Sequence, residues 1–170
     1  MPPRPPLPAT RLEPGPGQES VWDFPRPPRV EPSTERVVVR FGGQVVVDTR
    51  DSVRVLETSH PPGYYLPRAA FTEGVLVEAG GSTVCEFKGR AKYLDLRVGD
   101  EVAPRSAWSY PEPWPGYEEL RDRVALFPEA MDSCEVDGER VIHQAGGFYG
   151  GWITSRVVGP FKGGPGTLGW

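Results

Sequence analysis

The chain has 170 residues, of which 38% are hydrophobic, a formal net charge of -4, and 21 residues each of glycine and proline. This length supports one domain with its own core plus extensions, and the glycine and proline content predicts that part of the chain is unstructured. The charge excludes a general attraction to nucleic acid or to an anionic membrane, and no basic cluster supplies one locally.

The sequence predicts neither a membrane span nor a secretory signal. No apolar run approaches the roughly 20 residues that a membrane-spanning helix requires. The N-terminus has no apolar stretch behind its positive charges. Cys85 and Cys134 are too few for a disulfide framework, so we expect a cytoplasmic protein.

The N-terminal part of the chain is rich in proline. Eleven of the 21 prolines lie in the first 32 residues. Because proline lacks the backbone donor and fixes φ, residues 1–20 are expected to form a disordered or polyproline-like tail. Residues 21–35 add apolar side chains, and we expect them to lie along the folded domain as an extended strap that buries Trp22.

Two β-hairpins are predicted from their turn residues. Gly42-Gly43 separates Arg36–Phe41 from Gln44–Asp48, and both runs are rich in valine. Asp137-Gly138 divides the later run 133–142 in the same way. Such dipeptides adopt the positive φ that primed hairpin turns require.

Further short strands are predicted between these hairpins, at Ser52–Glu57, Tyr64–Arg68, Ser82–Phe87 and Ala91–Val98. We interpret Gly80-Gly81 as a hairpin-type break before the third of them. Turns recur every eight to twelve residues, which indicates an all-β sandwich or barrel-like architecture rather than βαβ units.

One helix is predicted, at Tyr117–Val124. Gly116 precedes it, acidic residues occupy its first turn and arginines its last, as the helix dipole favours. The folded domain as a whole is expected at residues 36–145.

Residues 146–170 form a glycine-rich and aromatic C-terminal extension. They contain nine of the 21 glycines, interspersed with large side chains such as Phe148 and Trp152. Glycine lets the backbone approach a neighbour closely while the rings dock. We therefore expect this extension to fold back onto the domain, or onto a second copy of it in a homodimer.

Metal binding and cysteine chemistry find little support. His60, Cys85, Cys134 and His143 are spread singly, whereas structural zinc takes its ligands in closely spaced pairs. Cys85 is expected on the apolar face of its strand as a buried thiol, and Cys134 has no obvious activating partner. No phosphate-binding glycine loop or hydrolase motif occurs, and no cofactor is predicted.

The candidate binding surface combines aromatic and charged residues. If the strands on either side of Gly89 pair, Lys88 and Tyr93 project near one another, and Trp108 shares a strand face with Tyr110. A lysine, two tyrosines and a tryptophan around a concavity suit a flat or cationic small ligand. The same residue types fit a core edge beside a solvated lysine equally well, and both interpretations stay open.

Several motifs carry a family resemblance. They are Lys88-Gly89-x-Ala91-x-Tyr93, Ala107-Trp108-Ser109-Tyr110-Pro111-Glu112-Pro113, Tyr65-x-Pro67-Arg68, and Val124-Ala125-Leu126-Phe127 before the Asp137-Gly138 turn. In combination they resemble the bacterial and fungal DUF427 family, over a stretch from about Arg36 to Val141. The terminal segments resemble extensions found in some members.

The resemblance implies a mainly β fold called the β-tent, in which two small antiparallel sheets meet at a steep angle. One short helix and extended N- and C-terminal segments complete the expected architecture. Related folds, methionine sulfoxide reductase B and the thalidomide-binding domain of cereblon, join their sheets with zinc bound by two Cys-x-x-Cys pairs. This chain has no such pair, so a metal-free version is expected. The nucleotidyltransferase label that the family has carried has no paired acidic metal ligands to support it here.

Two functions from different classes follow. A binding module would hold a small molecule or a modified residue in a pocket between the sheets, lined by Tyr65, Arg68, Lys88, Tyr93, Trp108 and Tyr110. An enzyme would use Lys88 or Tyr93 as acid, base or nucleophile, and a lysine in that role needs a lowered pKa. An interaction protein that works through its tails is a third alternative. We expect the binding module, with a small-molecule ligand and neither nucleic acid nor membrane as a partner.

Overall fold

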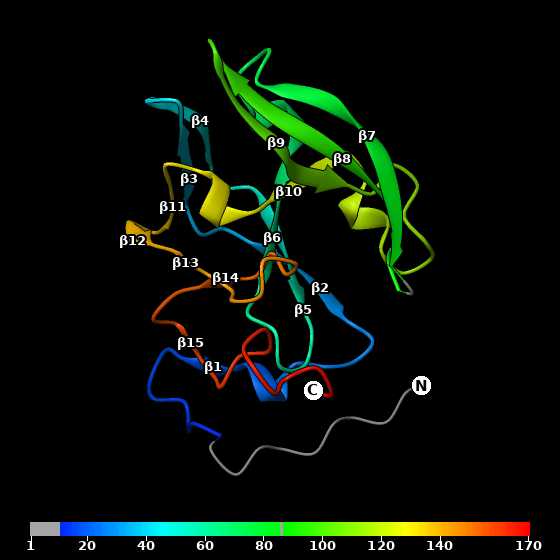
Figure 1. The fold of residues 1–170 in the computed structure, drawn as a ribbon. Helices are drawn as coiled ribbons and strands as arrows, with labels where there is room; N and C mark the ends of the chain where they lie inside the picture. Colours follow the sequence, from blue (N-terminus) through cyan, green and yellow to red (C-terminus); the bar gives the residue numbers. More distant parts are fainter. Residues whose placement is uncertain (1–10, 86) are drawn as a thin grey trace.

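The computed structural model describes residues 11–85 and 87–170, and these form several sheets that are mainly antiparallel (Figure 1). The largest sheet has seven antiparallel strands in the order β2-β5-β6-β10-β9-β8-β7. Its strands are β2 (Arg29–Ser33), β5 (Ser52–Leu56), β6 (Gly63–Pro67), β7 (Leu76–Cys85), β8 (Gly89–Val98), β9 (Glu101–Ser109) and β10 (Arg123–Leu126). The strap expected at residues 21–35 thus contains β2, which pairs with β5 along its whole length.

The two predicted hairpins form the second sheet, whose order is β12-β11-β3-β4. Its strands are β3 (Val37–Phe41), β4 (Gln44–Thr49), β11 (Ser133–Val136) and β12 (Glu139–Arg140). Gly42 and Gly43 have φ of 60° and 76°, and Asp137 and Gly138 have φ of 49° and 82°. Both hairpin predictions are confirmed, because these turns adopt the expected left-handed backbone.

Gly80-Gly81 does not end a strand, so the predicted hairpin-type break is wrong. Strand β7 runs through both glycines, and its register with β8 shifts between Glu78 and Ser82. Gly81 has φ of 92°, and the Arg105 guanidinium lies 2.7 Å from the position that a Cβ would take. The glycines therefore supply a β-bulge rather than a chain reversal.

The predicted helix at Tyr117–Val124 is also wrong. The structure has only a three-residue 3₁₀ segment, η3 (Glu118–Leu120), followed by strand β10. Asp122 has φ of 60°, which ends any helical continuation. A helix this short has little stability of its own, whereas a strand at this place pairs with both β6 and β9.

The remaining helical elements within residues 11–85 and 87–170 are equally short. They are the 3₁₀ segments η1 (Val21–Asp23), η2 (Arg68–Ala70) and η4 (Pro128–Ala130). In the described part of the chain, no helix has the length and apolar character needed to cross a membrane.

Alternation along the strands sends apolar side chains to both faces of the seven-stranded sheet. On one face Leu66, Leu96 and Leu126 join Val39 of the second sheet in the first core cluster. On the other face, neighbours one residue away, such as Tyr65 and Ala125, belong to a second cluster. This period of two is the ordinary strand pattern, and here both faces are covered.

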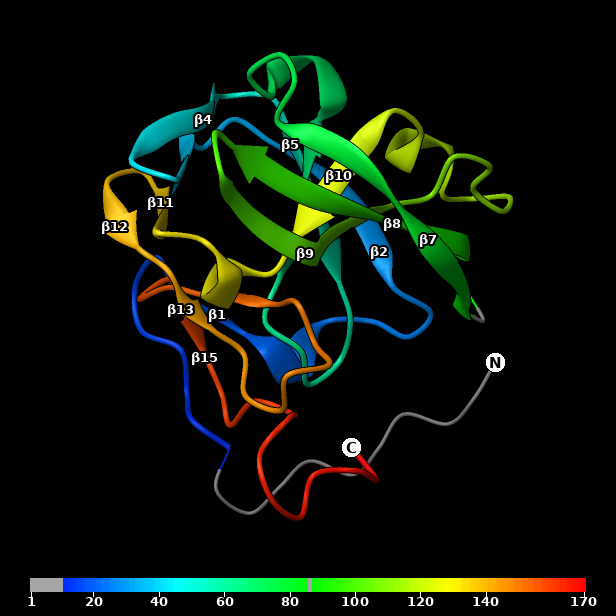
Figure 2. The same cartoon turned by 45° about the horizontal axis from the view of Figure 1, so that its top comes forward.

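The terminal segments lie side by side against the sheets. Strand β1 (Glu19–Ser20) pairs in parallel with β15 (Val157–Val158), as Figures 1 and 2 show below the seven-stranded sheet. Trp22 is fully buried in a third cluster with Val157, and its indole N–H donates to the Pro160 carbonyl oxygen at 2.9 Å. Residues 1–10 of the predicted tail lie outside the described residues.

The C-terminal segment also enters the main core. Strand β14 (Trp152–Ile153) pairs with β13 (Ile142–His143) and places Trp152 in the first cluster. The Trp152 ring lies 4.9 Å from the Tyr64 ring between centroids, and its indole N–H donates to the Leu126 carbonyl oxygen at 3.3 Å.

Replacing Trp152 by alanine is expected to lower the free energy of unfolding by about 3–5 kcal/mol, because it leaves a large cavity in the core. Phe148, from the same segment, is 77% exposed, and its replacement by alanine is expected to change stability by no more than about 0.5 kcal/mol. Urea unfolding of both variants measures the difference. Equal effects of the two substitutions would contradict a core role for Trp152.

Candidate functional site

A cavity of about 490 Å³ lies on the second-cluster face of the seven-stranded sheet. Strand residues line one side of it, and residues 147–151 with Lys162 of the C-terminal segment line the other. Among the described residues, none from the four-stranded sheet contributes. The cavity therefore lies between one face of the large sheet and the C-terminal segment, and not between the two sheets as expected. Its volume is within the range of about 300–1,000 Å³ common for small-molecule sites.

Strand register explains why aromatic side chains gather here. Trp108 of β9 lies opposite Tyr93 of β8 on one side and opposite Ala125 of β10 on the other. Its indole N–H donates to the Tyr65 hydroxyl at 3.2 Å, and its ring lies 4.6 Å from that of Phe127 between centroids. Trp108, Tyr65, Tyr93 and Phe127 all line the cavity.

Tyr65 connects the rings to one another. Its ring centroid lies 6.2 Å from that of Tyr110 and 6.5 Å from that of Trp108. Burial, followed by the neighbouring Tyr65, raises the pKa of Tyr110, so this hydroxyl keeps its proton. Tyr110 therefore contributes no charge to the aromatic side of the cavity at neutral pH.

Lys88 lies in the turn between β7 and β8 and is half-buried. Its Nζ lies 5.6 Å from the centroid of the Tyr110 ring, within reach of a cation–π interaction. Burial alone lowers the pKa of Lys88, but Tyr65, Cys85 and Glu57 outweigh it and leave the pKa raised. The amine is therefore protonated at neutral pH, which is the opposite of what a nucleophilic or basic lysine needs.

Tyr93 faces the cavity from β8. Its hydroxyl shares a hydrogen bond with the Thr83 hydroxyl at 2.9 Å, and the Arg105 guanidinium carbon lies 4.4 Å from its ring centroid. These contacts hold the ring in place.

Arg68 does not line the cavity, although the other five predicted residues do. Strand β6 ends at Pro67, and Arg68 begins η2 with an exposed side chain and its backbone N–H donating to the Asp122 carbonyl oxygen. Proline cannot continue the ladder, so the chain leaves the sheet before Arg68 reaches the cavity face.

Sequence reasoning missed His60, which follows β5 and lines the cavity. Its Nδ1 lies 3.2 Å from the Gln144 amide nitrogen, and its ring lies 5.3 Å from that of Tyr149 between centroids. Burial, with the positive charges of Lys162, Arg26 and Lys88, lowers the pKa of His60 to about 3. A lone histidine before two prolines gave no signal of this environment.

Sequence reasoning also missed the C-terminal side of the cavity. A Cβ at Gly150 would collide with the Trp108 ring, and one at Gly151 would lie 2.6 Å from Pro61 Cγ and from Gln144 Oε1. The glycines thus allow the backbone to lie directly on aromatic and proline side chains. The glycine-rich and aromatic composition of residues 146–170 predicted that this extension packs closely on the domain, but not where it packs.

The two cysteines differ in environment. Cys85 is half-buried at the end of β7 and lines the cavity, so it is not the fully buried thiol that we expected. Cys134 is buried in β11, and burial raises the pKa of its thiol well above the usual value. Within residues 11–85 and 87–170, no three His, Cys, Asp or Glu side chains converge as metal ligands would.

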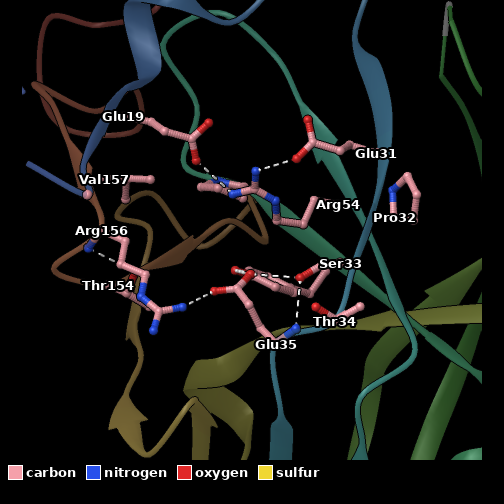
Figure 3. Close-up of a pocket in the computed structure, with 13 residues that line it drawn as sticks. Glu19, Glu31, Pro32, Ser33, Thr34, Glu35, Arg54, Thr154, Arg156 and Val157 are labelled. Carbon is pink, nitrogen blue, oxygen red and sulfur yellow. Dashed lines mark hydrogen bonds and ion pairs between the residues drawn. The ribbon is translucent and has the colours of Figure 1, made fainter.

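A second, smaller cavity of about 300 Å³ lies among charged residues near β1 and β2 (Figure 3). There Arg54 bonds Glu19 at 3.0 Å and Glu31 at 2.8 Å. Arg156 pairs with Glu35 at 2.6 Å, and Tyr64 donates its hydroxyl hydrogen to the same carboxylate at 2.9 Å. These groups satisfy one another, so the network ties the terminal segments to the large sheet and is a weaker candidate for ligand binding.

Comparison with protein-family models matches residues 29–137 to a domain of unknown function (DUF427). The match begins with β2 and ends in the β11–β12 turn, so it contains Tyr65, Lys88, Tyr93, Trp108 and Tyr110. Residues 147–151 and Lys162 lie beyond it. A comparison with curated proteins found no match.

The lowered pKa of His60 predicts a loss of stability as the pH falls. The unfolded chain binds a proton at His60 below the ordinary pKa of 6.5, whereas the folded protein keeps this residue neutral down to about pH 3. Unfolding therefore takes up a proton between these values, and lowering the pH from about 7 to 5 costs about 2 kcal/mol of stability through His60. Urea unfolding measures the free energy of unfolding at both pH values. Its decrease from pH 7 to pH 5 should be smaller in His60→Gln than in the unchanged protein by this amount. An equal loss in both proteins would contradict the prediction.

Proposed function

Since the chain belongs to the DUF427 family, we propose that it is a binding protein that holds a small molecule or a modified residue in the 490 Å³ cavity. The observation that carries this proposal is the set of aromatic residues that line one side of it: Tyr65, Tyr93, Trp108 and Tyr110. Rings that face a concavity with few polar groups are the usual composition of a small-molecule site.

The arrangement of the polar groups supports the same proposal. Lys88, His60 and Gln144 reach the cavity from different segments of the chain. Tyr65 uses its hydroxyl to accept from Trp108, which fixes the orientation of the indole ring before any ligand arrives. Preorganised rings and a few directed polar groups reduce the entropic cost of binding.

The C-terminal segment makes the site a concavity. Without residues 147–151 and Lys162, the aromatic side chains would lie on an open face of the sheet. The close approach of Gly150 to the Trp108 ring supports a function in which this segment covers a bound molecule.

We also propose that the two larger sheets form the β-tent that the family resemblance implies. In support, a seven-stranded and a four-stranded antiparallel sheet share one core cluster, which includes Val39 and Leu96. On this proposal the ligand site lies on the outer face of the larger sheet.

A thermal-shift screen against a library of small metabolites and modified amino acids tests the binding proposal. A true ligand at 100 times its Kd stabilises by about 2.7 kcal/mol, which raises the Tm by roughly 5–10 °C in a chain of this size. Trp108→Leu is expected to abolish the shift, whereas Arg68→Ala, which changes an exposed residue outside the cavity, is expected to preserve it. Shifts that survive Trp108→Leu would show that the cavity is not the binding site.

A further inference from the structure

The charge of the cavity differs from that of the protein as a whole. The chain carries a net charge of -4 and has only three lysines, yet two of them, Lys88 and Lys162, line this one cavity. Among the described lining residues, the one carboxylate is Glu57, which pairs with Arg26 at 3.3 Å. Within the part of the chain that the structure describes, the cavity lining is therefore positive in an acidic protein.

The two lysines line the cavity from separate parts of the chain. Lys88 comes from the β7–β8 turn and Lys162 from the C-terminal segment, with its Nζ 5.9 Å from the centroid of the Tyr149 ring. Lys162 donates one hydrogen bond, to the backbone oxygen of Trp170 at 2.9 Å. An ammonium group has three donors, so two remain for another acceptor.

His60 shows that both charges act on the same region. The positive charges of Lys162 and Lys88 both disfavour the protonated form of His60 and help to lower its pKa. A neutral His60 adds no positive charge of its own, but its ring and the Gln144 amide provide polar contacts beside the lysines.

We propose that the ligand of this cavity is a planar aromatic anion, such as an aromatic carboxylate, held with its ring against Trp108 and its negative group toward Lys88 and Lys162. The inference rests on the proposed function and adds the ligand's charge and shape. The aromatic groups Trp108, Tyr65 and Phe127 offer planar apolar contacts, and the ammonium groups offer charge-assisted hydrogen bonds.

A cationic ligand fits this site poorly, which revises the expectation of a flat or cationic ligand drawn from the residue types. A cation entering the cavity would lose water and meet two like charges, while Glu57 is already paired. A carboxylate entering the same place exchanges water for two ammonium partners. The flat shape is retained and the sign of the charge is reversed.

Three probes with the same ring system and different charge test the inference: 2-naphthoate, 2-naphthamide and 2-naphthylmethylammonium. Isothermal titration calorimetry of the full chain at low salt is expected to show at least about tenfold tighter binding of 2-naphthoate than of 2-naphthamide, equivalent to about 1.4 kcal/mol. The ammonium probe is expected to bind more weakly still. Added salt should weaken 2-naphthoate more than 2-naphthamide.

Lysine variants assign the effect to this cavity. Lys88→Met and Lys162→Met are each expected to weaken 2-naphthoate by about tenfold and to leave the affinity for 2-naphthamide unchanged. The matched control is Lys92→Met, because Lys92 is the third lysine, exposed on β8 and outside the cavity lining. If Lys88→Met folds poorly, Lys88→Arg replaces it in the test. This variant keeps the charge and should retain most of the affinity for 2-naphthoate.

The outcomes separate this inference from the binding proposal itself. Equal or tighter binding of the amide or the ammonium probe, lost in Trp108→Leu, would overturn the anion preference while leaving a binding cavity. Binding of 2-naphthoate that is unchanged in both lysine variants, or weakened equally in Lys92→Met, would overturn the role of the two lysines. If none of the three probes binds, the planar anion is overturned as the ligand class, and the library screen decides the binding proposal on its own.

Discussion

The central strands of the seven-stranded sheet bury apolar side chains on both faces, and this is the constraint on which the rest of the structure depends. Consecutive residues of one strand, such as Val124, Ala125 and Leu126, are all buried because alternate side chains enter different clusters. A sheet of this kind has to be covered twice. The four-stranded sheet and Trp152 pack against one face, while η3 and the C-terminal segment pack against the other, where the cavity lies.

The C-terminal segment, which packs on the second face of the large sheet, also contributes to the stability of the core. The segment that places Lys162 beside the cavity also places Trp152 in the first core cluster and Val157 beside Trp22. The Arg54 and Arg156 ion pairs hold the same segments against the large sheet. The segment that carries Lys162 is therefore also held by contacts far from the cavity.

Local chemistry allowed much of the fold to be predicted from the sequence. Glycine and Asp-Gly turns define the hairpins, because the required φ is a property of those residues alone. The helix predicted at Tyr117–Val124 was wrong because charges that suit a helix dipole can also flank a strand. The choice between helix and strand depends here on pairing with β6 and β9, which lie far away in the sequence. Five residues of the cavity lining were singled out from the sequence because they lie on family motifs and strand faces. His60 and Lys162 line the cavity through tertiary packing that no local pattern encodes.

The contact between Gly150 and the Trp108 ring joins a part of the chain inside the family match to a part outside it. Trp108 belongs to the family domain, while Gly150 lies beyond residue 137, where the family match ends. In a family member without such a segment, the same aromatic residues would face solvent. Substitutions in residues 147–151 therefore change one wall of the cavity without altering the strand residues inside the family match.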